Sequence, residues 1–243
     1  MSDNGISATI KGLRSSIFYL GFIGLIIIVS IITCVLFFLP FPTRQRIATT
    51  GNWLTMVWLR LTCNIVIVVE GRKNIPEGPC VVLSNHQSTW ETFYLQWFFQ
   101  PASVILKHEL LWIPFFGWAL ALMQPIGIKR SKPASAIRHV LKKGEQRLAA
   151  GNKIVIYPEG TRVRENHLGD FKTSGAALAK AANVSILPVA HNAGDHWPLV
   201  GFIKQPGIIR LKIGPAIQPS DKDVRALTEQ ARQWIKQALE TPQ

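Results

Sequence analysis

Short apolar runs and longer segments of helical periodicity alternate along the chain from residue 64 onwards. The apolar runs predict buried strands at residues 65–70, 80–84, 103–106, 124–128, 153–157, 184–189 and 208–213. The segments between them predict helices at residues 89–99, 114–122, 134–150, 173–182 and 221–239. This alternation indicates an α/β fold, in which a central mixed and largely parallel sheet is flanked by helices.

Residues 17–39 form an apolar stretch without a charged side chain. Its 23 residues, at a rise of about 1.5 Å each, roughly match the ~30 Å hydrocarbon core of a bilayer. A signal peptide usually has a shorter apolar region, of about 7–15 residues, followed by a small-residue cleavage site. Here Pro40, Phe41 and Pro42 follow instead. The length also argues against a buried core helix, so we expect a retained membrane anchor.

A second, weaker apolar segment covers residues 52–64 and contains Trp53 and Trp58, with Arg60 in its interior. It suits a shallow or re-entrant helical hairpin with the first segment, because tryptophan favours membrane interfaces; an ordinary helix packed on the domain fits it equally well. Basic residues flank the anchor on both sides, so the positive-inside rule gives no orientation, whereas a hairpin would leave both flanks on the cytoplasmic side. We expect an N-terminal membrane anchor of one or two helices at residues 1–63 and the α/β domain at residues 64–243.

The charge of the chain indicates an anionic partner. The formal net charge is +13 and the pI is about 10.1. No nucleic-acid-binding motif accompanies these charges, so with an anchor present anionic lipid headgroups are the simpler partner and no nucleic acid is expected. The predicted helix at residues 134–150 carries a basic stripe that suits lipid, an acidic carrier protein or a solvated face: Arg138, Lys142, Lys143 and Arg147.

His86 and Glu91 stand five positions apart, directly after the predicted strand at residues 80–84. A histidine oriented by a carboxylate is a common general base near neutral pH. Glu91 also fits a capping box with Ser88, in which its carboxylate binds the backbone at the start of a helix. The two roles are compatible, because one carboxylate oxygen is able to cap the helix while the other accepts the His86 ring N–H.

Polar residues follow four of the predicted strands at their carboxyl ends. His86 follows one strand, Lys107 the next, Lys129 and Arg130 a third, and residues 159–162 a fourth. In open α/β sheets ligands bind at this edge, so we expect these side chains to share a site. Lysine and arginine there suit an anionic headgroup, and the guanidinium fork suits phosphate in particular.

Four ordered motifs carry a resemblance to a known family. They are NHQSTWE from Asn85, QPIGIKR from Gln124, YPEGTR from Tyr157 and ILPVA from Ile186. With these motifs the chain resembles the glycerolipid acyltransferases, and most closely the bacterial 1-acylglycerol-3-phosphate O-acyltransferases. The resemblance covers roughly residues 64–214 and implies a glycerol-3-phosphate acyltransferase-like fold.

The resemblance implies a role for each matching residue. His86 would deprotonate the 2-hydroxyl of a lysophosphatidate, which attacks an acyl thioester, and Glu91 would orient His86. Arg162 and Lys107 would bind the acceptor phosphate, with Arg130 assisting. The remaining positions would shape the substrate pocket: Glu159, Gly160, Thr161 and Pro188. The family usually has aspartate at the position of Glu91, and this difference affects the strength of the pair rather than the reaction class.

The same resemblance implies the partners and the location. Acyl-CoA or acyl carrier protein would be the co-substrate, with no cofactor and no metal, and the product would be phosphatidic acid for phospholipid synthesis. The enzyme would lie at the bacterial inner membrane, in contact with its phospholipids, with the catalytic domain facing the cytoplasm. The alternatives are an acyltransferase for another lysolipid and a basic membrane-binding protein without activity. A serine esterase is disfavoured, because the chain has no G-x-S-x-G motif.

Overall fold

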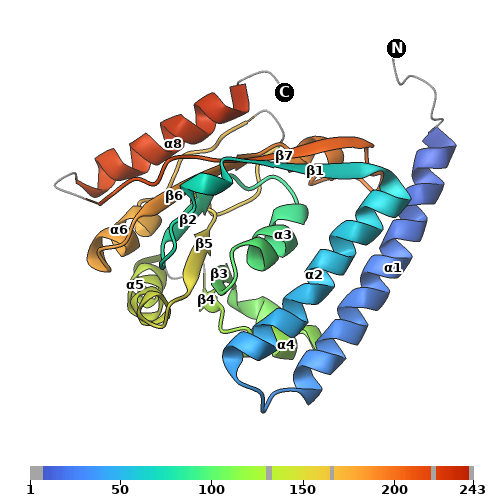
Figure 1. Ribbon diagram of the computed structural model, residues 1–243, viewed down its shortest axis with the longest axis horizontal. Coiled ribbons are helices and arrows are strands. Elements are labelled where there is room, and N and C mark those ends of the chain that lie inside the picture. The colour runs from blue at the N-terminus through green and yellow to red at the C-terminus, as the bar shows by residue number, and fades with distance from the viewer. Residues whose placement is uncertain (1–7, 130–132, 165–166, 220–222, 241–243) are drawn as a thin grey trace.

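A single twisted sheet forms the centre of the computed structural model, which describes residues 8–129, 133–164, 167–219 and 223–240 (Figure 1). Within these residues the sheet has seven strands in the order β1-β7-β6-β2-β5-β3-β4. All neighbours run parallel except β6 and β7, which are antiparallel. The strands are β1 Ile65–Glu70, β2 Val81–Ser84, β3 Ala102–Lys107, β4 Ile126–Ile128, β5 Lys153–Ile156, β6 Ile186–His191 and β7 Gly207–Ile213. The predicted mixed, largely parallel α/β sheet is confirmed.

Helices cover both faces of the sheet. On one face lie α5 Pro133–Ala149, α6 Ser174–Ala181 and α8 Val224–Glu240. The other face carries α1 Ala8–Val35, α2 Phe41–Cys63, α3 Trp90–Phe98, α4 Phe116–Leu122 and the short α7 Ala193–His196. Two 3₁₀ turns complete the described elements, η1 Arg72–Asn74 and η2 His108–Trp112. The five helices predicted after residue 64 are present, with ends shifted by at most three residues where the structure describes them.

Alternate residues of the central strands pack into two separate hydrophobic clusters. Val82 of β2 and Val155 of β5 belong to the cluster shared with α1, α2 and α3. Val81 and Ile154 belong to the cluster shared with α5, α6 and α8. Since successive strand residues point to opposite faces, these runs must be apolar at every position to be buried on both sides.

The first two helices form an antiparallel hairpin that packs on the sheet domain (Figure 1). Gly21 of α1 permits the close approach, because a side chain there would overlap the Trp58 ring of α2, and the Trp58 ring N–H donates to the Phe18 carbonyl at 3.2 Å. Asn52 of α2 in turn donates to the Phe93 carbonyl of α3 at 3.0 Å. The second apolar segment is thus part of a hairpin and also packs on the domain. The boundary between the predicted N-terminal anchor and α/β domain lies between α2 and β1, and the two-part division stays a prediction.

The helix α1 is long and apolar enough to cross a membrane, and no other described helix is. Its most apolar window has a mean hydropathy of 2.7 and is only 22% buried. The helix begins before the charge-free stretch and ends at Val35, because residues 36–39 form a turn ahead of Pro40. An exposed apolar helix of this length is evidence of membrane association. Whether it spans the bilayer stays a prediction.

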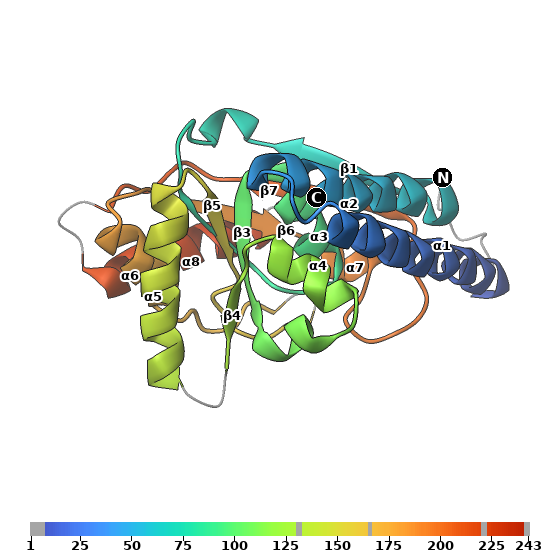
Figure 2. The ribbon, with the colours of Figure 1, turned by 90° about the horizontal axis from the view of Figure 1, so that it is seen from below.

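The predicted basic stripe on α5 does not share a surface with α1. Figure 2 shows α5 and α1 on opposite sides of the molecule. Arg138 and Lys142 are exposed, while Lys143 and Arg147 are partly buried. The stripe and the exposed face of α1 are therefore separate surfaces, and lipid, an acidic protein and solvent all stay open as the surroundings of the stripe.

Candidate active site

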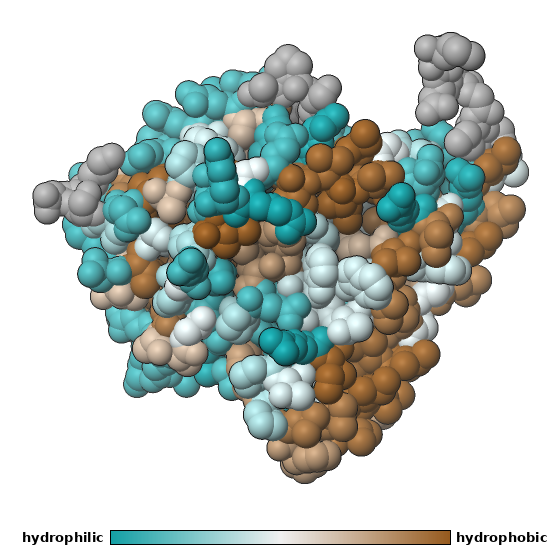
Figure 3. All heavy atoms as spheres, viewed as in Figure 1, coloured by the Kyte–Doolittle hydropathy of each residue, from teal (hydrophilic) through white to brown (hydrophobic). Residues whose placement is uncertain are grey.

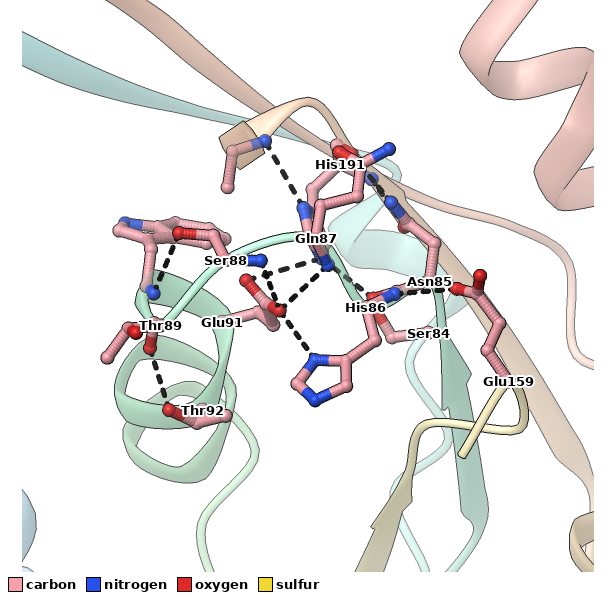
Figure 4. A network of polar contacts seen from close by, with 12 residues as sticks. Ser84, Asn85, His86, Gln87, Ser88, Thr89, Glu91, Thr92, Glu159 and His191 are labelled. Carbon is pink, nitrogen blue, oxygen red and sulfur yellow. Dashed lines mark hydrogen bonds and ion pairs between the residues drawn. The ribbon is translucent and has the colours of Figure 1, made fainter. Parts of the chain in front are cut away.

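The loop between β2 and α3 wraps around one oxygen of Glu91 (Figure 4). The Glu91 Oε1 atom lies 2.7 Å from His86 Nδ1 and accepts the backbone N–H groups of Gln87 and Ser88 at 3.0 and 2.8 Å. The predicted capping contact and the predicted pairing with His86 are both present. The prediction that one oxygen caps the helix while the other binds His86 is wrong, because the tight loop brings all three N–H donors to Oε1. The other oxygen, Oε2, has no hydrogen-bond partner among the described residues and lies 4.0 Å from His191 Nε2.

Glu91 is ionised in this environment. Burial of the carboxyl group by itself raises its pKa, but the hydrogen bond from His86, the fields of His191 and His86 and the Ser88 N–H together bring the pKa below its ordinary value. An ionised Glu91 requires that His86 donate from Nδ1, so the lone pair of the ring is at Nε2. His86 is 12% exposed and Glu91 is not exposed at all. The pair therefore has the arrangement of a general base with an orienting carboxylate.

Glu159 holds the backbone of His86 rather than lining the cavity. Its Oε1 accepts the His86 N–H at 2.8 Å and its Oε2 accepts the Gly169 N–H at 2.9 Å. The His86 carbonyl in turn accepts the Val163 N–H at 2.8 Å. Burial raises the pKa of Glu159, and the two N–H groups oppose that rise. The motif YPEGTR thus fixes the position of the histidine through backbone contacts.

The turn after β5 begins with a ring that contacts His86 and continues through a glycine with a positive φ. The Tyr157 ring stacks on the His86 ring with centroids 4.2 Å apart. Gly160 has a φ of +73°, and a Cβ at this residue would lie 2.6 Å from Lys172 Nζ. The left-handed conformation favours glycine, and a side chain here would in addition displace the flexible end of Lys172. Sequence reasoning gave no role to Lys172, whose ammonium adds a positive charge at this turn.

A largely apolar cavity of about 390 Å³ reaches the pair through Tyr157, whose ring stacks on His86, while His86 and Glu91 are not among its described lining residues. Tyr157 and Arg162 are among its lining residues, and most of the others come from α1, α2, α3, β3 and α4. The Tyr157 hydroxyl and the Arg162 Nε are buried without a hydrogen-bond partner in the described part of the chain. Buried polar atoms are normally paired, so these two point to a ligand that is polar near them and apolar along the rest of the cavity.

The other predicted site residues take different places. Lys107 ends β3 and Thr161 follows Gly160, and both are exposed at the same sheet edge as His86. Pro188 is buried within β6, pairs with Leu83 of β2 and is not a lining residue of the cavity. Arg130 lies outside the described residues.

One buried residue of the site was missed at the sequence level. His191, the last residue of β6, contacts both Asn85 and Glu91. The segment that follows it forms the short helix α7, and His191 and Trp197 on either side of this helix are both buried. The available signal was its position, since His191 follows an apolar run just as His86 does. Among the described residues no three His, Cys, Asp or Glu side chains are grouped as metal ligands would be.

Comparison with known sequences gives a consistent set of relatives. A sequence profile described as Acyltransferase matches residues 66–192. A protein of Pseudomonas aeruginosa named 1-acyl-sn-glycerol-3-phosphate acyltransferase is 47% identical over 206 residues, which is 83% of this chain and 80% of that protein. A yeast protein of the same name, from Saccharomyces cerevisiae, is 33% identical over 135 residues, which is 54% of this chain and 44% of that protein.

A solved structure shares the fold. The crystal structure titled as the 1-acyl-sn-glycerophosphate (LPA) acyltransferase PlsC from Thermotoga maritima superposes with a TM-score of 0.78. The match covers 94% of each chain at 23% sequence identity. At this identity the likeness supports the architecture, including the N-terminal helices, and not the details of the site.

Proposed function

Because the chain belongs to the acyltransferase family, we propose that it transfers an acyl group from an acyl thioester to the 2-hydroxyl of 1-acylglycerol 3-phosphate, forming phosphatidic acid. The observation that carries this proposal is the 2.7 Å contact between His86 Nδ1 and Glu91 Oε1, next to a cavity that combines an unpaired arginine nitrogen with apolar walls. The names of the relatives support the same acceptor.

The proposed reaction uses His86 as general base. His86 Nε2 takes the proton of the acceptor hydroxyl while the hydroxyl oxygen attacks the thioester carbonyl carbon. The new C–O bond forms, the C–S bond breaks, and the departing sulfur receives the proton back from His86. Glu91 stabilises the imidazolium between these steps, because its buried carboxylate stays ionised beside Nδ1. One proton thus passes through His86 from the acceptor hydroxyl to the departing thiol, and the protein is unchanged at the end of the reaction.

Direct attack is favoured over an acyl-enzyme on Ser88. The Ser88 hydroxyl is buried, donates to the Trp197 carbonyl at 2.6 Å and accepts the Trp90 N–H at 3.1 Å. A hydroxyl with both partners inside the protein is not available as a nucleophile for a bound thioester. The acceptor hydroxyl is then the nucleophile.

The acceptor phosphate would bind at the basic edge of the sheet. Arg162 supplies a partly buried guanidinium with a buried Nε, Lys107 an exposed ammonium at the end of β3, and Lys172 an ammonium over Gly160. By family resemblance Arg130 assists, and Gly160 and Thr161 shape the phosphate site. The cavity between α1, α2, α3 and α4 would hold an acyl chain, which is the apolar part of either substrate. Acyl-CoA and acyl carrier protein both remain candidate donors.

The membrane supplies the lipid acceptor. Hydrophobic residues gather along α1 and at the tip where α1 meets α2 (Figure 3). Phe37 and Phe38 at this tip are 64% and 67% exposed, and Trp112, Phe115 and Trp118 near α4 are exposed as well. An apolar surface of this extent fits burial in a bilayer rather than water. We place the protein on the cytoplasmic face of the bacterial inner membrane, where the hairpin and the α4 region enter the lipid.

A direct assay tests the proposed function. Purified protein in mixed micelles is given lysophosphatidate with acyl-CoA or with acyl carrier protein, and phosphatidic acid is measured. His86→Ala lowers kcat by about 10²–10⁴-fold, while His139→Ala, on the exposed face of α5, serves as the matched control and leaves kcat unchanged. Formation of product by His86→Ala at the wild-type rate overturns the mechanism. Transfer to a different lysolipid with no transfer to lysophosphatidate overturns the acceptor.

A further inference from the structure

A second histidine, His191, lies beside the His86–Glu91 pair and contacts the backbone of Asn85, the residue before His86 (Figure 4). Its side chain is fully buried. Its Nδ1 accepts the Ala193 N–H at 3.3 Å, so the ring proton is on Nε2. From there it donates to the Asn85 carbonyl at 3.0 Å, and Nε2 is also 4.0 Å from Glu91 Oε2.

Asn85 completes the link between β2 and β6. Its side-chain amide donates to the His191 carbonyl at 2.9 Å and its Oδ1 accepts the His191 N–H at 3.0 Å. Both residues are at most 1% exposed, so these hydrogen bonds are made away from water. The peptide group between Asn85 and His86 is thus held at both ends, its carbonyl by His191 and its N–H by Glu159 at 2.8 Å.

We propose that neutral His191 is a positioning residue for the transfer reaction: it fixes the peptide that carries His86 and directs an N–H dipole at the oxygen of Glu91 that has no hydrogen-bond partner among the described residues. Without this donor the buried Asn85 carbonyl would keep only the longer hydrogen bond from the Ser84 hydroxyl, at 3.2 Å, and the peptide would lose its tie to β6. A displacement of about 1 Å at a reacting group costs on the order of 10²-fold in rate. The inference rests on the proposed function for its kinetic test only.

Three ionisable groups act on His191 from the elements around it. They are Glu91 from α3, His86 from the loop after β2, and Asp195 from α7. Burial lowers the pKa of His191, and Glu91 together with the bond to the Asn85 carbonyl opposes this shift. The net direction is downward, so His191 is neutral at pH 7, in agreement with its one donated and one accepted hydrogen bond.

Two substitutions separate the donor from the bulk of the side chain. His191→Gln keeps an N–H that reaches the Asn85 carbonyl, whereas His191→Leu fills similar space without a donor. We expect His191→Leu to lower kcat by about 10²-fold with both KM values within about threefold, and His191→Gln to stay within about tenfold of wild type. His139→Gln, the same change on exposed α5, leaves all values unchanged. Equal losses for the Gln and Leu variants, in folded protein, overturn the proposal.

A second variant keeps the test usable if His191→Leu does not fold. His191→Asn retains a partner for the Ala193 N–H, but its shorter amide does not reach the Asn85 carbonyl. Circular dichroism establishes that each variant is folded at the assay temperature. We expect His191→Asn to lose the same order of activity as His191→Leu, and wild-type kcat in this variant overturns the proposal.

A chemical readout needs no substrate. Diethylpyrocarbonate modifies neutral imidazole, and mass spectrometry of the peptide that contains His86 gives its rate of modification at each pH. In the variants without the donor we expect the midpoint of this pH profile to move to lower pH, because a displaced Glu91 no longer stabilises the imidazolium. An unchanged midpoint overturns the positioning role. If the midpoint moves while wild-type protein makes no phosphatidic acid, the proposed function fails and the role of His191 stands.

Discussion

The ring of Tyr157 lies flat against the ring of His86, with their planes inclined by 15° and their centroids 4.2 Å apart. Tyr157 directly follows β5, the neighbour of the strand that precedes His86. The phenol therefore fixes the plane of the imidazole, while Glu91 fixes its rotation through Nδ1. Burial raises the pKa of the Tyr157 hydroxyl well above its ordinary value, so the group remains protonated at working pH.

This contact predicts different effects for two substitutions at Tyr157. Tyr157→Phe preserves the stacked ring and should leave kcat for lysophosphatidate within about threefold of wild type. Tyr157→Ala frees the imidazole to tilt away from the acceptor, and kcat should fall by about tenfold or more. Steady-state kinetics on both variants check this. A Phe variant as slow as the Ala variant would assign the catalytic contribution to the hydroxyl instead of the ring.

Glu91→Gln tests the charge of the orienting residue apart from its shape. An amide oxygen at Oε1 still accepts the N–H groups of Gln87 and Ser88, so the start of α3 is retained. The imidazolium loses its counter-charge, and kcat should fall by about 10²-fold with little change in KM. Glu91→Asp keeps the charge but shortens the reach to the three donors, so we expect an intermediate loss of about tenfold. A Gln variant faster than the Asp variant contradicts the role of charge.

The lowered pKa of Glu91 also predicts a dependence of stability on pH. The carboxyl pKa is below its ordinary value of 4.5 in the folded protein, so the unfolded chain binds the proton more readily. The stabilisation is therefore fully present above about pH 4.5 and is lost as the pH falls through the lower, folded-state pKa. Thermal unfolding of wild type and Glu91→Gln between pH 3 and 7 measures the difference. If the stability advantage of wild type over Glu91→Gln grows as the pH falls, the prediction is contradicted.

Much of the fold was predictable because its signals are local. A strand such as β1, at Ile65–Glu70, is apolar along nearly its whole length, and its predicted bounds agree with the structure. The length of α2 was not predictable, because its first turns contain Arg44 and Arg46 and lack an apolar stripe. Arg44 fits there since its guanidinium donates to the nearby carbonyls of Phe37 and Leu39 and to the carbonyl of Leu122, which is 78 positions away.

The site was predictable where its residues are close in sequence. His86 and Glu91 lie one turn apart, so spacing alone suggested their contact. The clamp formed by Glu159 and His191 was not predictable, because its contacts join residues 73 and 106 positions apart and depend on which strands are neighbours in the sheet. The order of the sheet is set by packing over the whole domain, and local periodicity does not contain it.

Arg162 should contribute to acceptor binding. Its Nε is buried and has no hydrogen-bond partner among the residues described, so a phosphate oxygen would supply one. Arg162→Met should raise KM for lysophosphatidate by about tenfold or more, and Arg162→Lys should restore only part of the loss, since an ammonium lacks the two-pronged geometry. Arg164→Met, at an exposed position two residues on, is the matched control. A wild-type KM in Arg162→Lys would contradict a role for the guanidinium geometry and would leave only the positive charge as the contribution of Arg162.

The tip of the N-terminal hairpin should contribute to membrane binding. Replacing Phe37 and Phe38 by Asp places two charges where exposed aromatic rings now stand. Binding to vesicles of phosphatidylethanolamine and phosphatidylglycerol, measured by cosedimentation, should weaken by about tenfold or more, because each buried aromatic ring contributes roughly 1.5–3 kcal/mol. Ile137→Asp, at an exposed apolar residue of α5 on the far side, should have no effect. Equal binding by the double variant and wild type would place the contact elsewhere.

A buried lysine joins α1 to the segment after α7. Lys204 is 1% exposed, and its ammonium donates to the Tyr19 hydroxyl at 2.8 Å and to the Phe202 carbonyl at 2.9 Å. The ammonium also lies 5.4 Å from the centre of the Trp197 ring, which packs against Phe18 of α1. The hydrogen bonds and ring contacts compensate for the loss of water around the charge.

Burial lowers the pKa of Lys204 from 10.5 to about 8, and this shift predicts the sign of a stability change. Between these two values the unfolded chain binds more protons than the folded chain, so the contribution of Lys204 to stability rises as the pH increases from about 8 to about 10.5. Lys204→Met keeps the apolar stem and removes the titration. Thermal unfolding in detergent micelles at pH 7 and pH 10 should therefore show wild type gaining stability relative to Lys204→Met at the higher pH. A relative gain at the lower pH would mean that the folded protein stabilises the ammonium, and that its contacts with Tyr19 and Phe202 outweigh the loss of hydration.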